Sequence, residues 1–159
     1  MATYTGLAGV SSLGVALGYA AESTAGTKPA AFTALHRINS IGGITISPET
    51  IDASALEDDV EKSVAGRATT GGTWTVSVNI TDDTIEEWED VIDAYNALSG
   101  GKQMWFEVTS SQLTDGFFVI AQPPQSLPMP EIGQNELLTM DIELTIVDYK
   151  GSDTKVTIS

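Results

Sequence analysis

The sequence lacks cysteine and has few basic residues, and each scarcity removes a class of function. Without cysteine there is no disulfide, thiol nucleophile or cysteine zinc site. Only 7 Lys and Arg stand against 22 Asp and Glu, which gives a net charge of -15. Nucleic-acid binding needs clustered cations at the phosphates, so this balance disfavours sequence-specific nucleic-acid recognition. It equally disfavours docking on anionic membranes.

Long hydrophobic runs are also missing. The mildly apolar stretch 6–21 is interrupted by Ser and Gly and has no basic flank. It is too short to span a bilayer, so we expect neither a membrane helix nor a signal peptide, and synthesis in the cytoplasm. The 159 residues, 42% of them hydrophobic, fit one folded domain with a real core.

The clearest signal that is present is a strand over residues 73–80. Apolar and neutral polar side chains alternate there, which is typical of a strand with one face on a core and the other in water. The apolar set is Trp74, Val76, Val78 and Ile80, and the polar set is Thr73, Thr75, Ser77 and Asn79.

A helix is predicted directly after this strand, over residues 84–98. Thr84 and Glu87 have the spacing of a capping box, and Gly100 with Gly101 ends the helix. One apolar stripe runs along it and consists of Ile85, Trp88, Ile92, Tyr95 and Leu98.

The remaining periodicities predict further antiparallel strands. They lie near residues 32–39, 44–51, 102–109, 117–122 and 137–147. Six or seven strands with one helix indicate a mainly β fold, an antiparallel β-sandwich or barrel with the helix on a flank. We divide the chain into an N-terminal segment 1–30, a domain 31–150 and a polar tail 151–159. The first segment is either a flexible terminus or an arm that orders against a partner.

The segment 53–72 is the longest predicted connection. Acidic residues crowd its first half and small residues its second half. Leu56, Val60 and Val64 have the spacing of one helical turn, but the segment lacks the apolar mass of a core element. We therefore expect a projecting loop, which in a small domain is usually functional or disordered.

No constellation of catalytic residues emerges. His36 is the only histidine, and we expect it in a strand or turn rather than in a catalytic triad. The acids at 57–61 and 82–93 lack the ligand spacing of a calcium loop. Asp141 and Glu143 would lie about 7 Å apart on one strand, roughly the separation of a retaining glycosidase pair, but nothing else supplies a pocket. We expect no enzyme activity, no metal and no cofactor.

Residues 35–148 resemble the major tail tube proteins of long non-contractile-tailed, siphovirus-type bacteriophages. The resemblance rests on ITI at 44–46, ETIDASALED at 49–58 and EKSVAG at 61–66, in that order. A Gly-rich turn, the strand 74–80, the helix, a strand containing Trp105 and a long final strand complete it.

The resemblance implies a β-sandwich that assembles into hexameric rings, which stack into a hollow tube in the virion tail. DNA passes through the lumen of such tubes during ejection, and the tube protein of type VI secretion shares the architecture. Implied partners are other copies of the chain, a tape measure protein, a baseplate initiator and a tail terminator, with no membrane.

Two groups of residues are candidates for these roles. A neutral to acidic sheet face suits a channel through which DNA moves without sticking, although such residues also occur on ordinary outer faces. The lumen candidates are Thr73, Thr75, Ser77, Asn79, Thr139, Asp141, Glu143 and Thr145. The candidates for contacts between rings are Leu56, Glu57, Asp58, Asp59, Val60, Glu61 and Lys62.

A different class of function stays open alongside the tube subunit. The chain fits a β-sandwich binding or decoration module of a virion or cell surface, whose site would lie on loop tips. Trp105, expected on the solvent face of its strand, is a candidate contact in that case.

Overall fold

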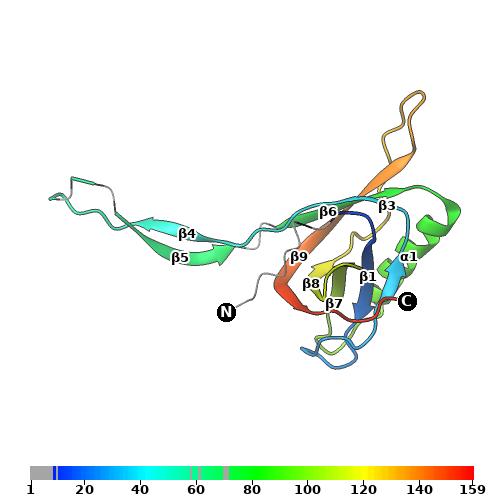
Figure 1. The fold of residues 1–159 in the computed structure, drawn as a ribbon, viewed down its shortest axis with the longest axis horizontal. Coiled ribbons are helices and arrows are strands. Elements are labelled where there is room, and N and C mark those ends of the chain that lie inside the picture. The colour runs from blue at the N-terminus through cyan, green and yellow to red at the C-terminus, as the bar shows by residue number, and fades with distance from the viewer. Residues whose placement is uncertain (1–8, 10, 58, 61, 70–71) are drawn as a thin grey trace.

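The computed structural model describes residues 9, 11–57, 59–60, 62–69 and 72–159 (Figure 1). Seven strands form one antiparallel sheet in the order β2-β1-β7-β8-β9-β6-β3, and β4 with β5 forms a separate two-stranded sheet. The mainly β class with one helix is confirmed. The elements are β1 (Val15–Ala21), β2 (Thr33–Leu35), β3 (Ile38–Ile41), β4 (Ser47–Asp52), β5 (Ser63–Thr69), β6 (Thr73–Asn79), α1 (Asp82–Asn96), β7 (Met104–Ser110), β8 (Asp115–Gln122) and β9 (Thr139–Thr154).

The two edge strands of the large sheet are consecutive in the chain. Only His36 and Arg37 separate β2 from β3, and Arg37 has a φ of 56°, in the left-handed region. The chain bends at this residue, so one segment pairs with β1 before the bend and with β6 after it. The sheet therefore curls back on itself. The single strand predicted over 32–39 is in fact two strands.

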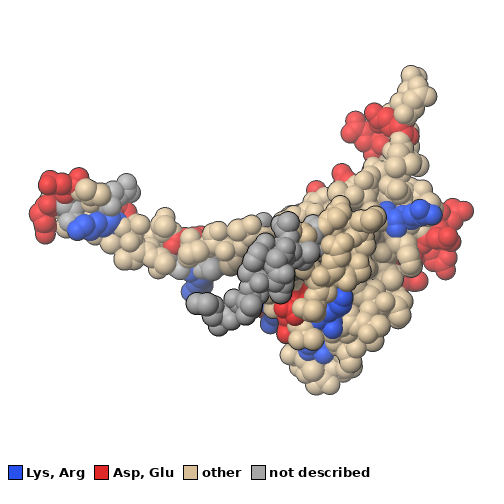
Figure 2. All heavy atoms as spheres, viewed as in Figure 1, with Lys and Arg blue, Asp and Glu red and all other residues tan. Residues whose placement is uncertain are grey.

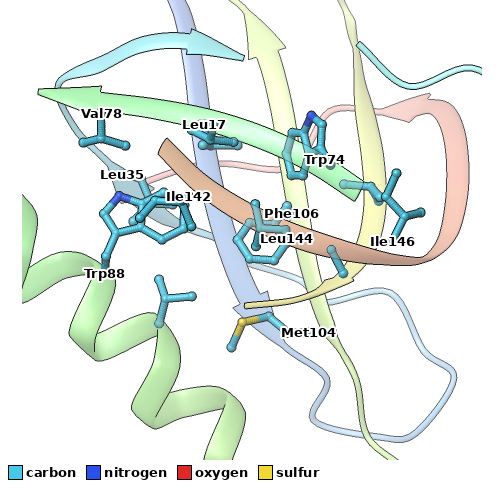
Figure 3. Close-up of a cluster of buried hydrophobic side chains, with 14 of the residues drawn as sticks. Leu17, Leu35, Trp74, Val78, Trp88, Met104, Phe106, Ile142, Leu144 and Ile146 are labelled. Carbon is cyan, nitrogen blue, oxygen red and sulfur yellow. The ribbon is translucent and has the colours of Figure 1, made fainter. Parts of the chain in front are cut away.

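The main core fills the inside of this curled sheet (Figure 3). The alternation predicted for 73–80 holds, with Val76 and Val78 fully buried. Trp74 packs edge-on against Phe106 of β7, with 5.9 Å between ring centroids. Four of the five side chains predicted to face inward from the last long strand are buried: Met140, Ile142, Leu144 and Ile146. The fifth, Leu138, lies before the start of β9 and is exposed.

Helix α1 covers the core from the side and begins earlier than predicted. The N-cap is Thr81, whose side chain accepts a hydrogen bond from the Thr84 N–H, while the Thr84 hydroxyl accepts from the Thr81 N–H. The capping box is thus Thr81–Thr84, and the prediction of Thr84 with Glu87 was wrong. The third helical position of a capping box usually carries Glu or Gln, but here it is Thr84. The N-terminus of the helix could therefore not be recognised from the usual motif. Trp88, fully buried, anchors the helix to the sheet.

The N-terminal segment differs from the expected arm over much of its length. Val15–Ala21 is a strand that pairs with β7 along its whole length, and Leu17 is buried in the core. Small residues on its other face masked the alternation. At Gly18 a Cβ atom would lie 3.1 Å from the Cβ of Phe32, so this strand packs too closely for larger side chains. Residues 1–8 and 10 of the expected arm lie outside the described residues.

A second, smaller apolar cluster lies on the outer face of β7 and β8. The end of the chain covers it, with Val156 and Ile158 packed against the cluster and Ile158 bridged to Phe32. The cluster consists of Phe32, Trp105, Phe118 and Ile120. Trp105 is only 6% exposed, so its expected role as an exposed contact is wrong. The tail predicted from residue 151 also differs, because β9 continues to Thr154.

No helix in the described ranges has the length and apolar character needed to cross a membrane.

Candidate functional site

The eight lumen candidates lie together on one face of two neighbouring strands. Strands β6 and β9 are hydrogen-bonded in antiparallel register, and residues directly opposite each other point to the same side. The opposed pairs are Thr73 with Thr145, Thr75 with Glu143, Ser77 with Asp141, and Asn79 with Thr139. The sequence supplied the two sets separately, and the register joins them into one surface, here called the polar face.

The polar face extends onto both neighbouring strands. Ser40 of β3 lies opposite Ser77, and Gln122 of β8 lies opposite Thr145, and both are exposed. Asp141 and Glu143 are exposed and are the only charged residues among these positions. The face is therefore hydrophilic, weakly negative and free of cations.

The sequence also raised Asp141 and Glu143 as a candidate carboxylate pair. Asp141 and Glu143 do not line any of the five depressions described on the surface. Among the residues that the structure describes, no cluster of three or more His, Asp and Glu side chains is placed to hold a metal ion.

His36 lies at the bend between β2 and β3 and fastens it to the helix. Its Nδ1 is 2.5 Å from Oε1 of Glu87, and its backbone N–H donates to Oε2 of the same carboxylate at 2.9 Å. The prediction of a turn position for His36 is confirmed. Glu87, expected to cap its own helix, instead binds this bend.

The predicted projecting loop is a long β-hairpin. Strands β4 and β5 continue the β3–β6 pair beyond the sheet, and together they form the arm, residues 47–69, which points away from the body of the molecule (Figure 1). Pro48 lies beside a register shift in β4, as its missing N–H requires. The helical turn suggested by the spacing of Leu56, Val60 and Val64 is wrong, since Val64 belongs to β5.

Backbone and side-chain hydrogen bonds join the two strands of the arm just before its tip. Ala53 N–H donates to Lys62 O at 2.8 Å, and Lys62 N–H donates to Ser54 Oγ at 2.7 Å. Asp52 accepts from the Ser54 N–H at 2.9 Å, which lowers the pKa of this carboxyl.

The contact candidates gather at this tip, and those described are exposed. Leu56 is 106% exposed and Val60 is 72% exposed, which is unusual for aliphatic residues in a folded protein. Glu57, Asp59 and Lys62 are also exposed, and acidic and basic side chains lie together at this end of the arm (Figure 2). Asp58 and Glu61 lie outside the described residues.

A second projection was missed from the sequence. Residues 129–138, here called the β8–β9 loop, rise from the body at the upper right of Figure 1. Met129 is 87%, Ile132 67% and Leu137 68% exposed. Because Pro128 and Pro130 break any periodicity here, the sequence predicts no helix or strand over residues 129–136. The only sequence feature that marks this segment is a set of apolar side chains, in a composition otherwise typical of a solvent-exposed connection.

Comparison with known proteins gives a likeness in fold. No family model matches the chain, and no curated protein matches it. The fold is similar to that of a chain in the 6-fold symmetrised cryo-EM structure of the anti-feeding prophage baseplate, with a TM-score of 0.54 over 98% of both chains. At 12% sequence identity this likeness concerns the fold alone.

Proposed function

We propose that this chain is a structural subunit of a phage-type tail tube, which forms hexameric rings that stack into a hollow conduit for DNA. The observation that carries the proposal is the likeness in fold, along 98% of both chains, to a chain of a prophage baseplate with 6-fold symmetry. The order of sequence motifs across residues 35–148 points to the same class of protein independently.

The polar face supports a role as the lumen wall. Hydroxyl and amide side chains keep such a wall wet, and carboxylates repel phosphate at short range. Lysine or arginine would form ion pairs with each passing phosphate and slow the DNA. In a ring the face of each copy would continue into that of its neighbours, giving a weakly negative channel.

The arm supports assembly for a different reason. An isolated two-stranded hairpin is marginally stable in water, and this one leaves Ile51 and Val64 more than half exposed. A partner that covers the arm would remove this apolar surface from water. We assign the ring-to-ring contact to the arm tip, with Leu56 and Val60 as its anchors.

The proposed role is structural and not enzymatic. Its partners are further copies of the chain along the tube, a tape measure protein, an initiator at the baseplate and a terminator at the far end. The place of action is the virion tail.

A second candidate is a baseplate subunit that forms a single ring layer. It is favoured by the fact that the similar fold belongs to a baseplate. The surface-binding or decoration module is the third reading, and it requires a monomer that binds a ligand. Negative-stain microscopy of the purified protein separates the three: long hollow tubes, isolated rings, or monomers at all concentrations.

The lumen assignment is tested by reversing the charge of the face. In a particle assembled from this subunit, Asp141→Lys with Glu143→Lys should leave the tubes intact and slow DNA release. The matched control is Glu89→Lys with Asp93→Lys on the exposed side of α1, which makes the same change in charge away from the face. Normal release from the first double variant would contradict the assignment.

A further inference from the structure

We infer that the arm of one copy docks onto the β8–β9 loop of the next copy, so that layers join head to tail. This rests on the stacking proposed above and adds the surface that receives the arm. Three apolar side chains of this loop are largely exposed: Met129, Ile132 and Leu137. The loop is held to its own chain at its end, where the Leu138 carbonyl accepts a hydrogen bond from the Ile80 N–H at 3.0 Å.

The arm and the loop project from opposite ends of the polar face. β6 begins at Thr73, on the side of the arm, and ends at Asn79. β9 runs the other way, so its first residue, Thr139, lies opposite Asn79, and the β8–β9 loop enters at that end. Figure 1 shows the arm leaving on one side and the loop rising on the other, with β6 and β9 between them.

This arrangement makes each projection available to the other in a neighbouring copy. Within one copy the two cannot meet, because the length of the β6–β9 pair separates them. A second copy displaced along the strand direction brings its loop to the arm of the first. The contact is heterologous, so it leaves a free arm at one end and a free loop at the other, and it repeats without closing.

The two surfaces share an apolar character. Both present isolated aliphatic side chains: Leu56, Val60 and Val64 on the arm, and Met129, Ile132 and Leu137 on the loop. The loop also carries Glu131 and Glu136 and no base, whereas the arm tip carries exposed Glu57 and Asp59 and β5 carries exposed Arg67. The aliphatic contact at the tip must therefore outweigh repulsion between carboxylates, and Arg67 is a cation of the arm that attracts the acidic loop.

One such contact is small, and this has a consequence for assembly. A pair of monomers would gain little from a single arm on a single loop, because association first costs translational and rotational freedom. In a ring all copies present their arms together, and the second and later contacts form at high effective concentration. The contact should therefore hold layers together only when rings meet rings.

Complementary variants test the head-to-tail geometry. The arm variant is Leu56→Ser with Val60→Ser, and the loop variant is Met129→Ser with Ile132→Ser. Each alone should stop at single rings, since every junction needs one intact arm and one intact loop. Rings of the two variants made separately and then mixed should form double layers and no more. Leu13→Ser, an exposed leucine outside both surfaces, should still give long tubes.

Mass photometry and microscopy distinguish the outcomes. Long tubes from either variant alone, or no double layers in the mixture, would overturn the arm–loop contact. If the wild-type protein forms tubes while this happens, the tube function survives and only the contact fails. If the wild-type protein forms neither rings nor tubes, both fail together.

Disulfide trapping gives a direct check, because the natural chain has no cysteine. Copies carrying Leu56→Cys are mixed with copies carrying Ile132→Cys under mild oxidation during assembly. A crosslinked dimer is expected between the two. The matched control replaces Ile132→Cys by Glu89→Cys on the helix, where no crosslink should form. Equal crosslinking in both mixtures would contradict the contact.

Discussion

Two chain segments run between the body and the arm, β3 into β4 and β5 into β6, yet the two regions are stabilised in different ways. Within the body, β6 buries Val76 and Val78 completely. In the arm, every residue of β4 is exposed, and the opposed pair Ile51 and Val64 has no core to cover it. Each region has its own antiparallel hydrogen-bond ladder, but only the body buries its side chains. The comparison indicates that hydrogen bonds between strands define the shape of each region, whereas burial of apolar side chains determines its stability.

The arm therefore needs a partner that the body does not. Burial of apolar area is the main favourable term in folding, and the arm has little of it. Substitutions in the body should therefore destabilise the free subunit far more than substitutions in the arm.

Truncation of the buried tryptophan should have the largest effect. Trp88→Ala removes the side chain that joins α1 to the sheet and should cost about 3–5 kcal/mol of unfolding free energy. Denaturant titration of the subunit measures this. Trp88→Phe is the control, since phenylalanine keeps most of the side-chain volume. The substitution also breaks no hydrogen bond, because the indole Nε1 of Trp88 has no partner among the described residues. Equal losses in both variants would show that volume at this position is not what matters.

Glu107 gives a pH-dependent test within the body. Its carboxyl is buried on β7, with Oε1 accepting from the Val156 N–H at 2.8 Å and Oε2 without a partner among the described residues. Burial raises the pKa of Glu107, and nearby Lys28 and Lys155 oppose that shift only in part. The folded state thus favours the protonated form, so this residue destabilises the fold as the pH rises through its folded pKa.

Glu107→Gln should consequently raise the thermal midpoint at neutral pH, because an uncharged amide avoids the burial penalty. This gain in thermal midpoint should shrink as the pH falls below the ordinary pKa range of a glutamate, because Glu107 is then protonated and uncharged like the glutamine. Calorimetry across that range measures the difference. A gain that does not depend on pH would contradict a titrating Glu107.

Removal of the helix cap should have a smaller effect. Thr81→Ala loses the side-chain oxygen that accepts from the Thr84 N–H and should cost about 1 kcal/mol. Thr81→Ser keeps that oxygen and should stay close to the wild-type value. Chemical denaturation compares the three proteins, and a loss shared by the serine variant would point to the methyl group instead of the cap.

Substitution in the arm should have the smallest effect on the free subunit. Ile51→Ser removes an apolar side chain that is 55% exposed, so the unfolding free energy should change by no more than about 0.5 kcal/mol. The same substitution should weaken assembly, which sedimentation measures. A loss comparable to that of Trp88→Ala would mean that the arm is packed in the free subunit.

The sequence predicted the parts of this fold that have a strong local period. Apolar and polar residues alternate in 73–80 and 137–147, and this alternation indicates which side chains are buried. The predicted core-facing residues within β6 and β9 are therefore correct. Val15–Ala21 was missed because its glycine and alanines pack closely and show no alternation. The start of α1 was misplaced because Thr84 replaces the expected acidic partner of the cap.

The candidate site was predicted in its members but not in its arrangement. Each polar set follows from a two-residue period, yet the register that brings Ser77 opposite Asp141 depends on pairing between distant segments. The β8–β9 loop could not be recognised, since exposure of Met129 or Ile132 is a property of the surroundings and not of the residues themselves.

Amide hydrogen exchange, compared between the free subunit and the assembled protein, tests the central claim most directly. The account predicts that amides of the arm, residues 47–69, exchange quickly in the free subunit and become strongly protected on assembly. Amides of β6 and β9 should be protected in both states. An arm that is already protected in the free subunit, or one that remains unprotected in the assembly, would contradict the account.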